Sequence, residues 1–242
     1  MSASVWAIGD IHGKSDVLAA LTAALPRGEQ DFTVYLGDYI DRGPDSAGVV
    51  AHVMGEADRA PGRTVLLWGN HEDLAAAHFG IPAPSVFEYD AEDWFRNGGR
   101  ETMVSFACHP SGLSEAACPP ELARLFPRLQ SFWRPPIDRF PTLGHVVFVH
   151  AGLLPAQQPE DAPGEVLLWV RDEFLKEFDS SGRLVIHGHT PVKKIVPQVD
   201  KIGIDTGAVY GGSLSALQLP ERRVYQADAQ GRVRSFDLPD PV

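Results

Sequence analysis

The first 80 residues alternate between short apolar runs and amphipathic segments, and this alternation restricts the possible fold more than any other feature of the chain. Three runs, each stopped by a glycine, have the pattern of a short buried strand: residues 5–8, 32–36 and 64–68. Helical patterns follow them, beginning at Ser15, near Asp45 and at about Glu72. Three strand–loop–helix units in succession predict a largely parallel sheet covered by helices.

The pattern changes between about residues 80 and 142, where prolines are frequent and the apolar periodicity is helical and interrupted. We expect a cap-like insertion of short helices and loops there. Strand patterns return at 146–149 and 184–186, and residues 202–236 contain several short strand patterns with glycine-rich turns. We therefore predict one α/β domain over residues 1–242, built from two packed sheets flanked by helices.

Charge and composition exclude several classes of protein. The 21 Lys and Arg residues against 32 Asp and Glu residues give a net charge of −11, so we expect no nucleic-acid partner. There is no run of about 18 apolar residues, and we expect neither a membrane span nor a secretory signal. The only cysteines are Cys108 and Cys118, which exclude a disulfide framework and favour the cytoplasm.

The loops that follow the five expected core strands share one composition. Each carries Asp, His or Asn beside a glycine: GDIHG at 9–13, GDYIDRG at 37–43, GNHE at 69–72, HAG at 150–152 and HGH at 187–189. The carboxyl ends of strands in an α/β sheet form the ligand crevice. The five loops are therefore expected to bring these side chains to one edge.

The ligand set favours divalent metal ions. Carboxylate and amide oxygens suit Mn or Mg, imidazole nitrogens suit Fe or Zn, and no thiolate is offered. A lone Asp-x-His after a strand is more often a turn or a helix cap, whereas the two acids and the arginine of GDYIDRG are a stronger signal, and the conjunction of five loops favours metal binding. Six or more candidate ligands are too many for one ion, and two ions about 3.5–4 Å apart that share a carboxylate are the usual arrangement in phosphate hydrolysis.

The order of the motifs GDIHG, GDYIDRG, GNHE, HAGL and GHT resembles that of the PPP family of metal-dependent Ser/Thr phosphatases. This family belongs to the calcineurin-like metallophosphoesterases. The chain looks most like the bacterial and phage branch, and it is also similar to diadenosine tetraphosphatases. The resemblance implies a calcineurin-like fold, with two packed mixed β-sheets between helices in four layers, α-β-β-α.

The resemblance also implies a role for each matching residue. It places Asp10 and His12 on a first metal, Asp38 between both metals, and Asn70, His150 and His189 on the second. It makes His71 the general acid and Asp41 the residue that orients the His71 ring and raises its pKa. It assigns Arg42 and Arg171 to the phosphate oxygens. For the two divalent metals we expect Mn, with Fe or Zn as alternatives.

The implied activity is hydrolysis of phosphomonoesters by a hydroxide that bridges the metals, with phosphoserine and phosphothreonine in proteins as the favoured substrates. The first alternative is hydrolysis of dinucleoside polyphosphates such as diadenosine tetraphosphate. The second is a scaffold that binds phosphorylated partners without turnover. The expected partners are a phosphorylated protein or a small phosphoester, and the sequence leaves the oligomeric state open.

Several residues near the motifs have more than one interpretation. Many bacterial relatives carry an arginine directly before GNHE, where this chain has Trp68, either a core residue or a surface for stacking a substrate ring. His187 is either a substrate contact, a support for the ligands or a bystander. Glu72 is explained as a carboxylate at a helix N-terminus. In the segment 94–100 we favour core packing and exposed charge over substrate contact.

Overall fold

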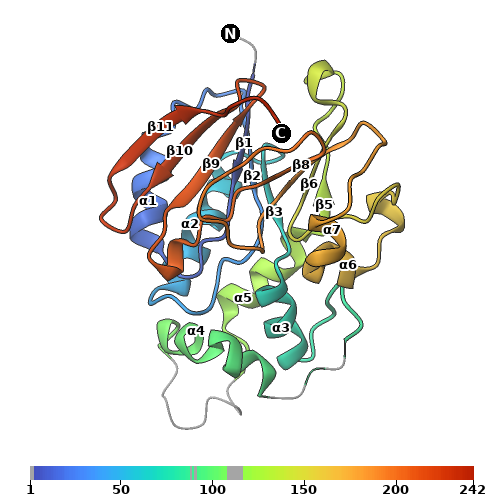
Figure 1. The fold of residues 1–242 in the computed structure, drawn as a ribbon. Helices are drawn as coiled ribbons and strands as arrows, with labels where there is room; N and C mark the ends of the chain where they lie inside the picture. The colour runs from blue at the N-terminus through green and yellow to red at the C-terminus, as the bar shows by residue number, and fades with distance from the viewer. Residues whose placement is uncertain (1–2, 88, 90–91, 108–116) are drawn as a thin grey trace.

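A computed structural model of the chain describes residues 3–87, 89, 92–107 and 117–242. Figure 1 shows two β-sheets side by side with helices on their outer faces. The first sheet has the strand order β11-β10-β9-β1-β2-β3-β4. Its strands are β1 (Val5–Ile8), β2 (Phe32–Tyr35), β3 (Thr64–Leu67), β4 (Leu129–Gln130), β9 (Leu214–Leu219), β10 (Arg223–Ala227) and β11 (Val233–Asp237).

The second sheet is smaller and has the strand order β5-β6-β7-β8. Its strands are β5 (Phe132–Trp133), β6 (Val146–Val149), β7 (Leu184–His187) and β8 (Lys201–Gly203). Strands β1 to β4 pair in parallel, as do β6 to β8, whereas β9, β10, β11 and β5 pair antiparallel with their neighbours. Both sheets are therefore mixed, as predicted.

Alternate residues of each central strand face opposite layers, and this places the core. In β1, Ala7 contacts the apolar cluster between the two sheets, whereas Ile8 contacts the cluster on the helix side. In β6, Phe148 and Val147 divide in the same way. Because strand side chains alternate, each fully apolar strand is buried on both faces. The four-layer α-β-β-α fold is confirmed.

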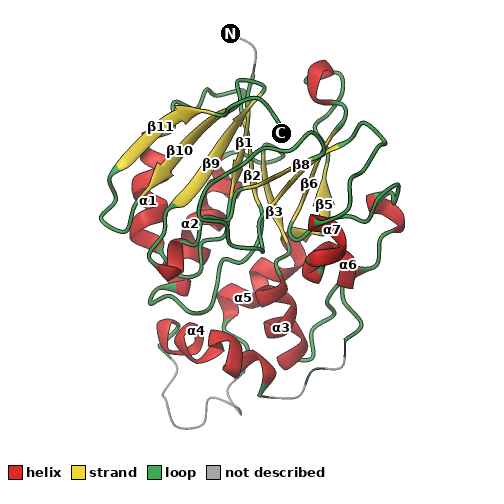
Figure 2. Ribbon diagram, viewed as in Figure 1, coloured by secondary structure: helices red, strands yellow, loops and turns green. Residues whose placement is uncertain are grey.

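Seven α-helices of the described residues connect or cover the strands (Figure 2). They are α1 (Ser15–Ala24), α2 (Ser46–Arg59), α3 (Asn70–His78), α4 (Arg100–Ser105), α5 (Pro120–Leu125), α6 (Gly164–Trp169) and α7 (Asp172–Leu175). Asp45 caps α2 by accepting a hydrogen bond from the amide of Gly48 at 2.8 Å. Helix α3 begins at Asn70, two residues before the predicted start.

Part of the expected insertion over residues 80–142 belongs to the two sheets. Its last part contains β4 and β5, which pair with β3 and β6 respectively. The earlier part carries a π-helical turn, Phe95–Gly99, followed by α4 and α5. Cys108 lies outside the described residues, and Cys118 is half-buried. Among the described helices, none has both the length and the apolar character needed to cross a membrane.

Candidate metal centre

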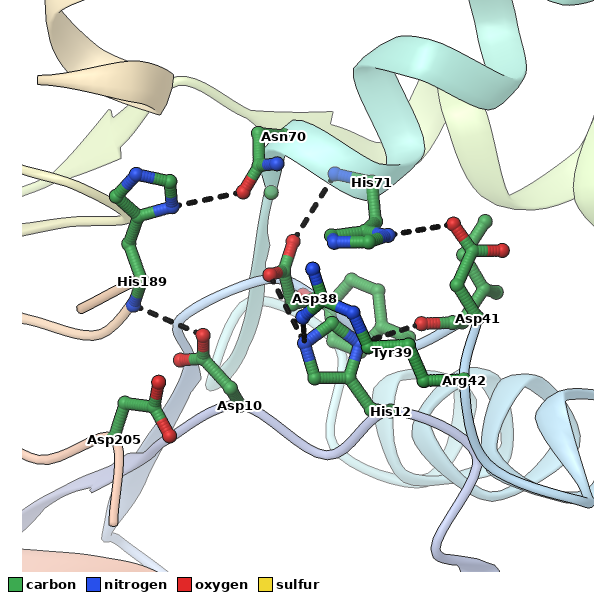
Figure 3. Close-up of polar contacts among 12 residues, drawn as sticks. Asp10, His12, Asp38, Tyr39, Asp41, Arg42, Asn70, His71, His189 and Asp205 are labelled. Atoms are coloured by element: carbon green, nitrogen blue, oxygen red, sulfur yellow. Dashed lines mark hydrogen bonds and ion pairs between the residues drawn. The ribbon is translucent and has the colours of Figure 1, made fainter. Parts of the chain in front are cut away.

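The loops after β1, β2, β3, β6 and β7 meet at one edge, as the sequence predicts (Figure 3). They bring together the six residues expected to bind metal, and every one of the six is at most 5% exposed: Asp10, His12, Asp38, Asn70, His150 and His189. Polar side chains are buried at this density only where partners or ions compensate them.

Asp38 lies at the middle of this cluster. Its Oδ2 atom is 3.3 Å from Nε2 of His12, and its Oδ1 atom is 3.5 Å from Nε2 of His150. Two sets of potential ligand atoms therefore share Asp38, one with His12 and His71 and one with His150 and His189, and within each set the atoms lie within 4.8 Å of one another. A shared carboxylate between two ligand sets is the arrangement that suits two cations.

Backbone carbonyls orient two of the imidazoles. Nδ1 of His12 lies 2.8 Å from the carbonyl oxygen of Ile40, and Nδ1 of His150 lies 2.7 Å from that of Leu36. A carbonyl only accepts, so each Nδ1 carries the proton and donates it. Burial lowers the pKa of His150, which keeps the ring neutral. Both Nε2 atoms therefore present lone pairs toward Asp38, as metal ligands do.

Asn70 adds a further lone pair to the second set. Its Oδ1 atom is 2.8 Å from Nδ1 of His189, which donates to it, and 3.0 Å from Nε2 of His150. Since the proton of His150 is already donated to Leu36, Nε2 of His150 and Oδ1 of Asn70 face each other as two acceptors. A cation between them would relieve this repulsion.

Asp10 has the clearest need for a cation. Its Oδ2 atom accepts the amide of His189 at 2.9 Å, whereas its Oδ1 atom is buried without a hydrogen-bond partner. Burial first, and then the negative charges of Asp205 and Asp38, raise the pKa of Asp10 well above its ordinary value. Nε2 of His189 is likewise buried without a partner. The residues present therefore fit divalent metal ions.

Asp205 is a residue of this cluster that sequence reasoning missed. It follows β8, is 5% exposed, and lies beside Asp10 in Figure 3. Burial raises its pKa, although the amide of Gly207 donates to its Oδ1 atom at 2.9 Å. The signal that identified the other loops, an acid directly after a strand, is present here also, but for residues 202–236 we predict only short strands with glycine-rich turns and no metal ligand.

The two arginines expected to bind phosphate lie on different sides of the cluster. Nη1 of Arg42 is 2.8 Å from Nε2 of His12, so its guanidinium covers the lone pair that a first metal would use. Arg171 is exposed, and its Nη1 atom is 3.5 Å from Oγ1 of Thr190. Burial, helped by the positive charge of Arg171, lowers the pKa of His189 to about 2.

His71, a member of the first ligand set, forms a buried pair with Asp41. Nδ1 of His71 lies 2.6 Å from Oδ2 of Asp41, and Nε2 of His71 is buried without a partner. Burial raises the pKa of Asp41 to about 8 and lowers that of His71 well below its ordinary value. Burial thus opposes the increase in the pKa of His71 that Asp41 was expected to cause. The hydrogen bond between the two side chains is present.

Glu72 does more than place a negative charge at the N-terminus of α3. Its two carboxylate oxygens accept four backbone amides, from Asp38 at 2.9 Å, Tyr39 at 2.9 Å, Ile40 at 3.2 Å and Gly69 at 3.1 Å. The side chain thereby ties the loop after β2 to the start of α3. The sequence pattern could not show this, because the contacts depend on the local path of residues 38–40.

Backbone strain is concentrated at this edge. Eight described residues other than glycine have a positive φ, and five of them belong to the candidate site: His12 (46°), Asp38 (52°), Asp41 (73°), Arg42 (66°) and His189 (64°). Such conformations persist only where surrounding contacts hold them, and they are frequent at functional sites.

Two residues with open interpretations belong to the core. The ring of Trp68 stacks on that of Phe126, with centroids 5.7 Å apart and planes 2° from parallel, and Trp68 is 7% exposed. His187 is buried with its ring 5.0 Å from that of Phe174. The packing of both rings favours a structural role over contact with substrate.

Known proteins are similar in sequence to this chain over nearly its whole length. The family model described as calcineurin-like phosphoesterase matches residues 3–222. Serine/threonine-protein phosphatase 1 of Salmonella typhimurium is 30% identical over 221 residues, which cover 89% of this chain and 91% of that protein. The symmetrical bis(5'-nucleosyl)-tetraphosphatase of Bordetella parapertussis is 27% identical, covering 93% of this chain and 96% of that one.

A solved structure gives the same architecture. The crystal structure of a cold-active protein-tyrosine phosphatase from a psychrophilic Shewanella species superposes with a TM-score of 0.63 at 17% identity. The match covers 98% of this chain and 81% of the other. At this level of identity the likeness bears on the fold alone.

Proposed function

The chain belongs to the calcineurin-like phosphoesterases, and we propose that it hydrolyses phosphomonoesters, with phosphoserine and phosphothreonine in proteins as the favoured substrates. The observation that carries this proposal is Asp38, shared between two ligand sets, with the His71–Asp41 pair beside it. The presence of both His71 and Asp41 disfavours the alternative of a scaffold that binds phosphorylated partners without hydrolysing them. Phosphorylated proteins or small phosphoesters are the proposed partners.

The metals would be held by the six expected ligands, Asp10, His12, Asp38, Asn70, His150 and His189, with Asp205 as added negative charge beside Asp10. Two divalent ions at such a site supply Lewis acidity, which lowers the pKa of the attacking water and draws charge from the phosphoryl oxygens. Mn is the proposed metal, with Fe and Zn as alternatives. The cytoplasm remains the location predicted from the sequence.

The protein's own groups complete the reaction. Nδ1 of His71 is bound to Asp41, so Nε2, which has no other partner, is the nitrogen from which the charged ring would give a proton to the leaving oxygen. The guanidinium groups of Arg42 and Arg171 are proposed to bind the phosphoryl oxygens, where paired N–H donors match the geometry of phosphate. Arg42 would have to leave the lone pair of His12 to do so.

A second candidate substrate is a dinucleoside polyphosphate. Relatives with that activity in their names cover nearly the whole chain. A hollow of about 440 Å³ also adjoins Arg42 and is lined by Phe95, Arg96, Arg100 and Tyr210 among others. The guanidinium of Arg42 lies 5.6 Å from the centre of the Tyr210 ring, which is 63% exposed. Arginines beside exposed aromatic rings suit a phosphate chain that ends in a base.

The test begins with p-nitrophenyl phosphate and Mn²⁺. We expect Asp10→Asn and Asp38→Asn each to lower kcat by about 100-fold or more, because a metal ligand is weakened. Asp138→Asn, a change of the same kind at an exposed position, should leave kcat unchanged. Near wild-type kcat in the first two variants would refute the mechanism. A phosphoserine peptide and diadenosine tetraphosphate, assayed side by side, then decide between the two substrate classes.

A further inference from the structure

Two residues of the inserted segment bind the carboxylate of Asp41, although they follow it by 53 and 61 positions. Nε1 of Trp94 donates to both oxygens, at 3.0 Å each. Oγ1 of Thr102 donates to Oδ1 at 2.7 Å and accepts the amide of Asp41 at 2.8 Å. Asp41 and Thr102 are 0% exposed, and Trp94 is 1% exposed. Water therefore cannot replace either donor.

Ser46 extends this network by one hydroxyl. Its Oγ atom accepts the amide of Asp41 at 3.2 Å and lies 3.0 Å from Oγ1 of Thr102. Because Thr102 gives its own proton to Asp41, Ser46 donates to Thr102. The Asp41 carboxylate then has donors on both oxygens, from Thr102, Trp94 and His71, and this set of bonds is compatible with a single orientation of the side chain.

Two adjacent glycines allow the inserted segment to come this close. Gly98 has φ +109°, and a Cβ atom there would lie 2.5 Å from the amide nitrogen of Arg42. A Cβ atom on Gly99 would lie 2.5 Å from the ring of Trp94. The Trp94 ring also packs on Phe79 at the end of α3, with centroids 5.3 Å apart. The segment is thus fitted to the loop that carries Asp41.

We propose that Trp94 and Thr102 are positioning residues for protonation of the leaving group: they fix Asp41, and Asp41 fixes the ring of His71. This inference rests on the proposed function and gives the inserted segment a part in the reaction. In the step concerned, the bond from phosphorus to the ester oxygen breaks, and its electron pair stays on that oxygen. The oxygen takes the Nε2 proton of His71, while the attacking water bonds to phosphorus and releases the proton that later restores His71.

This role predicts an effect that depends on the leaving group. The alkoxide of serine leaves poorly unless it is protonated, whereas p-nitrophenolate leaves readily without a proton. Removing a donor to Asp41 should therefore harm hydrolysis of phosphoserine more than hydrolysis of p-nitrophenyl phosphate. A residue that only stabilises the fold would lower both activities by the same factor.

The experiment compares kcat for the two esters at saturating Mn²⁺ in full-length variants. Thr102→Val and Trp94→Phe remove one donor each; the first keeps the side-chain volume, and the second replaces the indole by a smaller aromatic ring. In both we expect the ratio of kcat for the aryl ester to kcat for the serine ester to rise about tenfold or more, with little change in KM. Thr102→Ser should restore the wild-type ratio. Thr22→Val, which removes a buried hydroxyl of α1, serves as the matched control.

Equal losses on both esters, or no loss on either, would overturn the positioning role. If Thr102→Val does not fold, Trp94→Phe provides the same test, because it removes the other donor to the Asp41 carboxylate. Should the wild-type protein hydrolyse neither ester, the proposed function itself fails, and that result is distinct from an unchanged ratio in active variants.

Discussion

Nε2 of His150 and Oδ1 of Asn70 lie 3.0 Å apart, and both atoms present lone pairs. The proton of His150 is held on the other ring nitrogen, 2.7 Å from the carbonyl of Leu36. Two buried acceptors at this distance repel each other unless a cation lies between them. The folded protein should therefore bind divalent cations more tightly than the unfolded chain does.

Metal binding should raise thermal stability. We expect excess Mn²⁺ to raise Tm, because a ligand at about 100 times its Kd adds about 2.7 kcal/mol to the free energy of unfolding. A chelator should reverse the shift, Asp38→Asn should abolish most of it, and Asp138→Asn should retain it. Differential scanning calorimetry measures all four. An identical shift in Asp38→Asn would show that the metal binds elsewhere.

Stability at acid pH should depend on Glu56, far from the metal centre. Burial raises the pKa of Glu56, but hydrogen bonds from Arg27 at 2.6 and 2.7 Å, together with His52 and Tyr35, outweigh burial and hold the pKa well below 4.5. A depressed folded-state pKa stabilises the protein above the unfolded-state value, and this stability is lost as the pH falls below about 4.5.

Glu56→Gln should therefore cost about 2 kcal/mol at pH 7 and flatten the dependence of stability on pH below 4.5. Urea unfolding between neutral and acid pH checks this, with the exposed Glu29→Gln as control. If Glu56→Gln lost stability with falling pH as steeply as the wild type, the Arg27–Glu56 pair would not be the cause.

Glu72→Gln should weaken the metal centre without contacting it. The carboxylate accepts two amides on each oxygen, whereas a glutamine would turn its NH₂ group toward two donors. We expect a loss of about 2–4 kcal/mol in the free energy of unfolding and weaker Mn²⁺ binding, because the loop that carries Asp38 is released. Calorimetric titration with Mn²⁺ measures the latter.

Glu165→Gln is the control for this variant, since Glu165 accepts a single amide, that of Val86 at 2.7 Å, and a glutamine oxygen can still do so. Wild-type Mn²⁺ affinity in Glu72→Gln would mean that the loop after β2 keeps its path without the four bonds.

Trp68 should affect stability and leave substrate binding unchanged. Its ring stacks on Phe126, so Trp68→Phe should cost about 1 kcal/mol, and Trp68→Ala about 3–5 kcal/mol. KM for diadenosine tetraphosphate and for a phosphoserine peptide should be the same in Trp68→Phe and the wild type. A KM that rises only for the dinucleotide would restore the stacking interpretation.

Much of this edge could be predicted from the sequence because its chemistry repeats at every strand end. A buried parallel strand and the loop beyond it are indicated by an apolar run, a glycine and then Asp10, Asp38 or Asn70. The topology of an α/β sheet brings these loops together at the carboxyl ends of the strands. The six expected ligands do converge, and the α-β-β-α layers are as predicted.

The residues that were missed depend on contacts between distant parts of the chain. Thr102 reaches Asp41 across 61 positions, and no periodicity marks that contact. The four amides bound by Glu72 depend on the local path of one loop. Trp68 could not be assigned from sequence alone, because aromatic residues at strand ends face either the core or the crevice, and here Phe126 covers the ring.

The metal content of the protein tests the central claim most directly. After saturation with Mn²⁺ and removal of free metal, elemental analysis of the wild-type protein should give two divalent ions per chain, and Asp38→Asn should retain fewer. A wild-type protein that holds no metal or a single ion, or an Asp38→Asn variant that still holds two, would contradict a dinuclear centre built around this carboxylate.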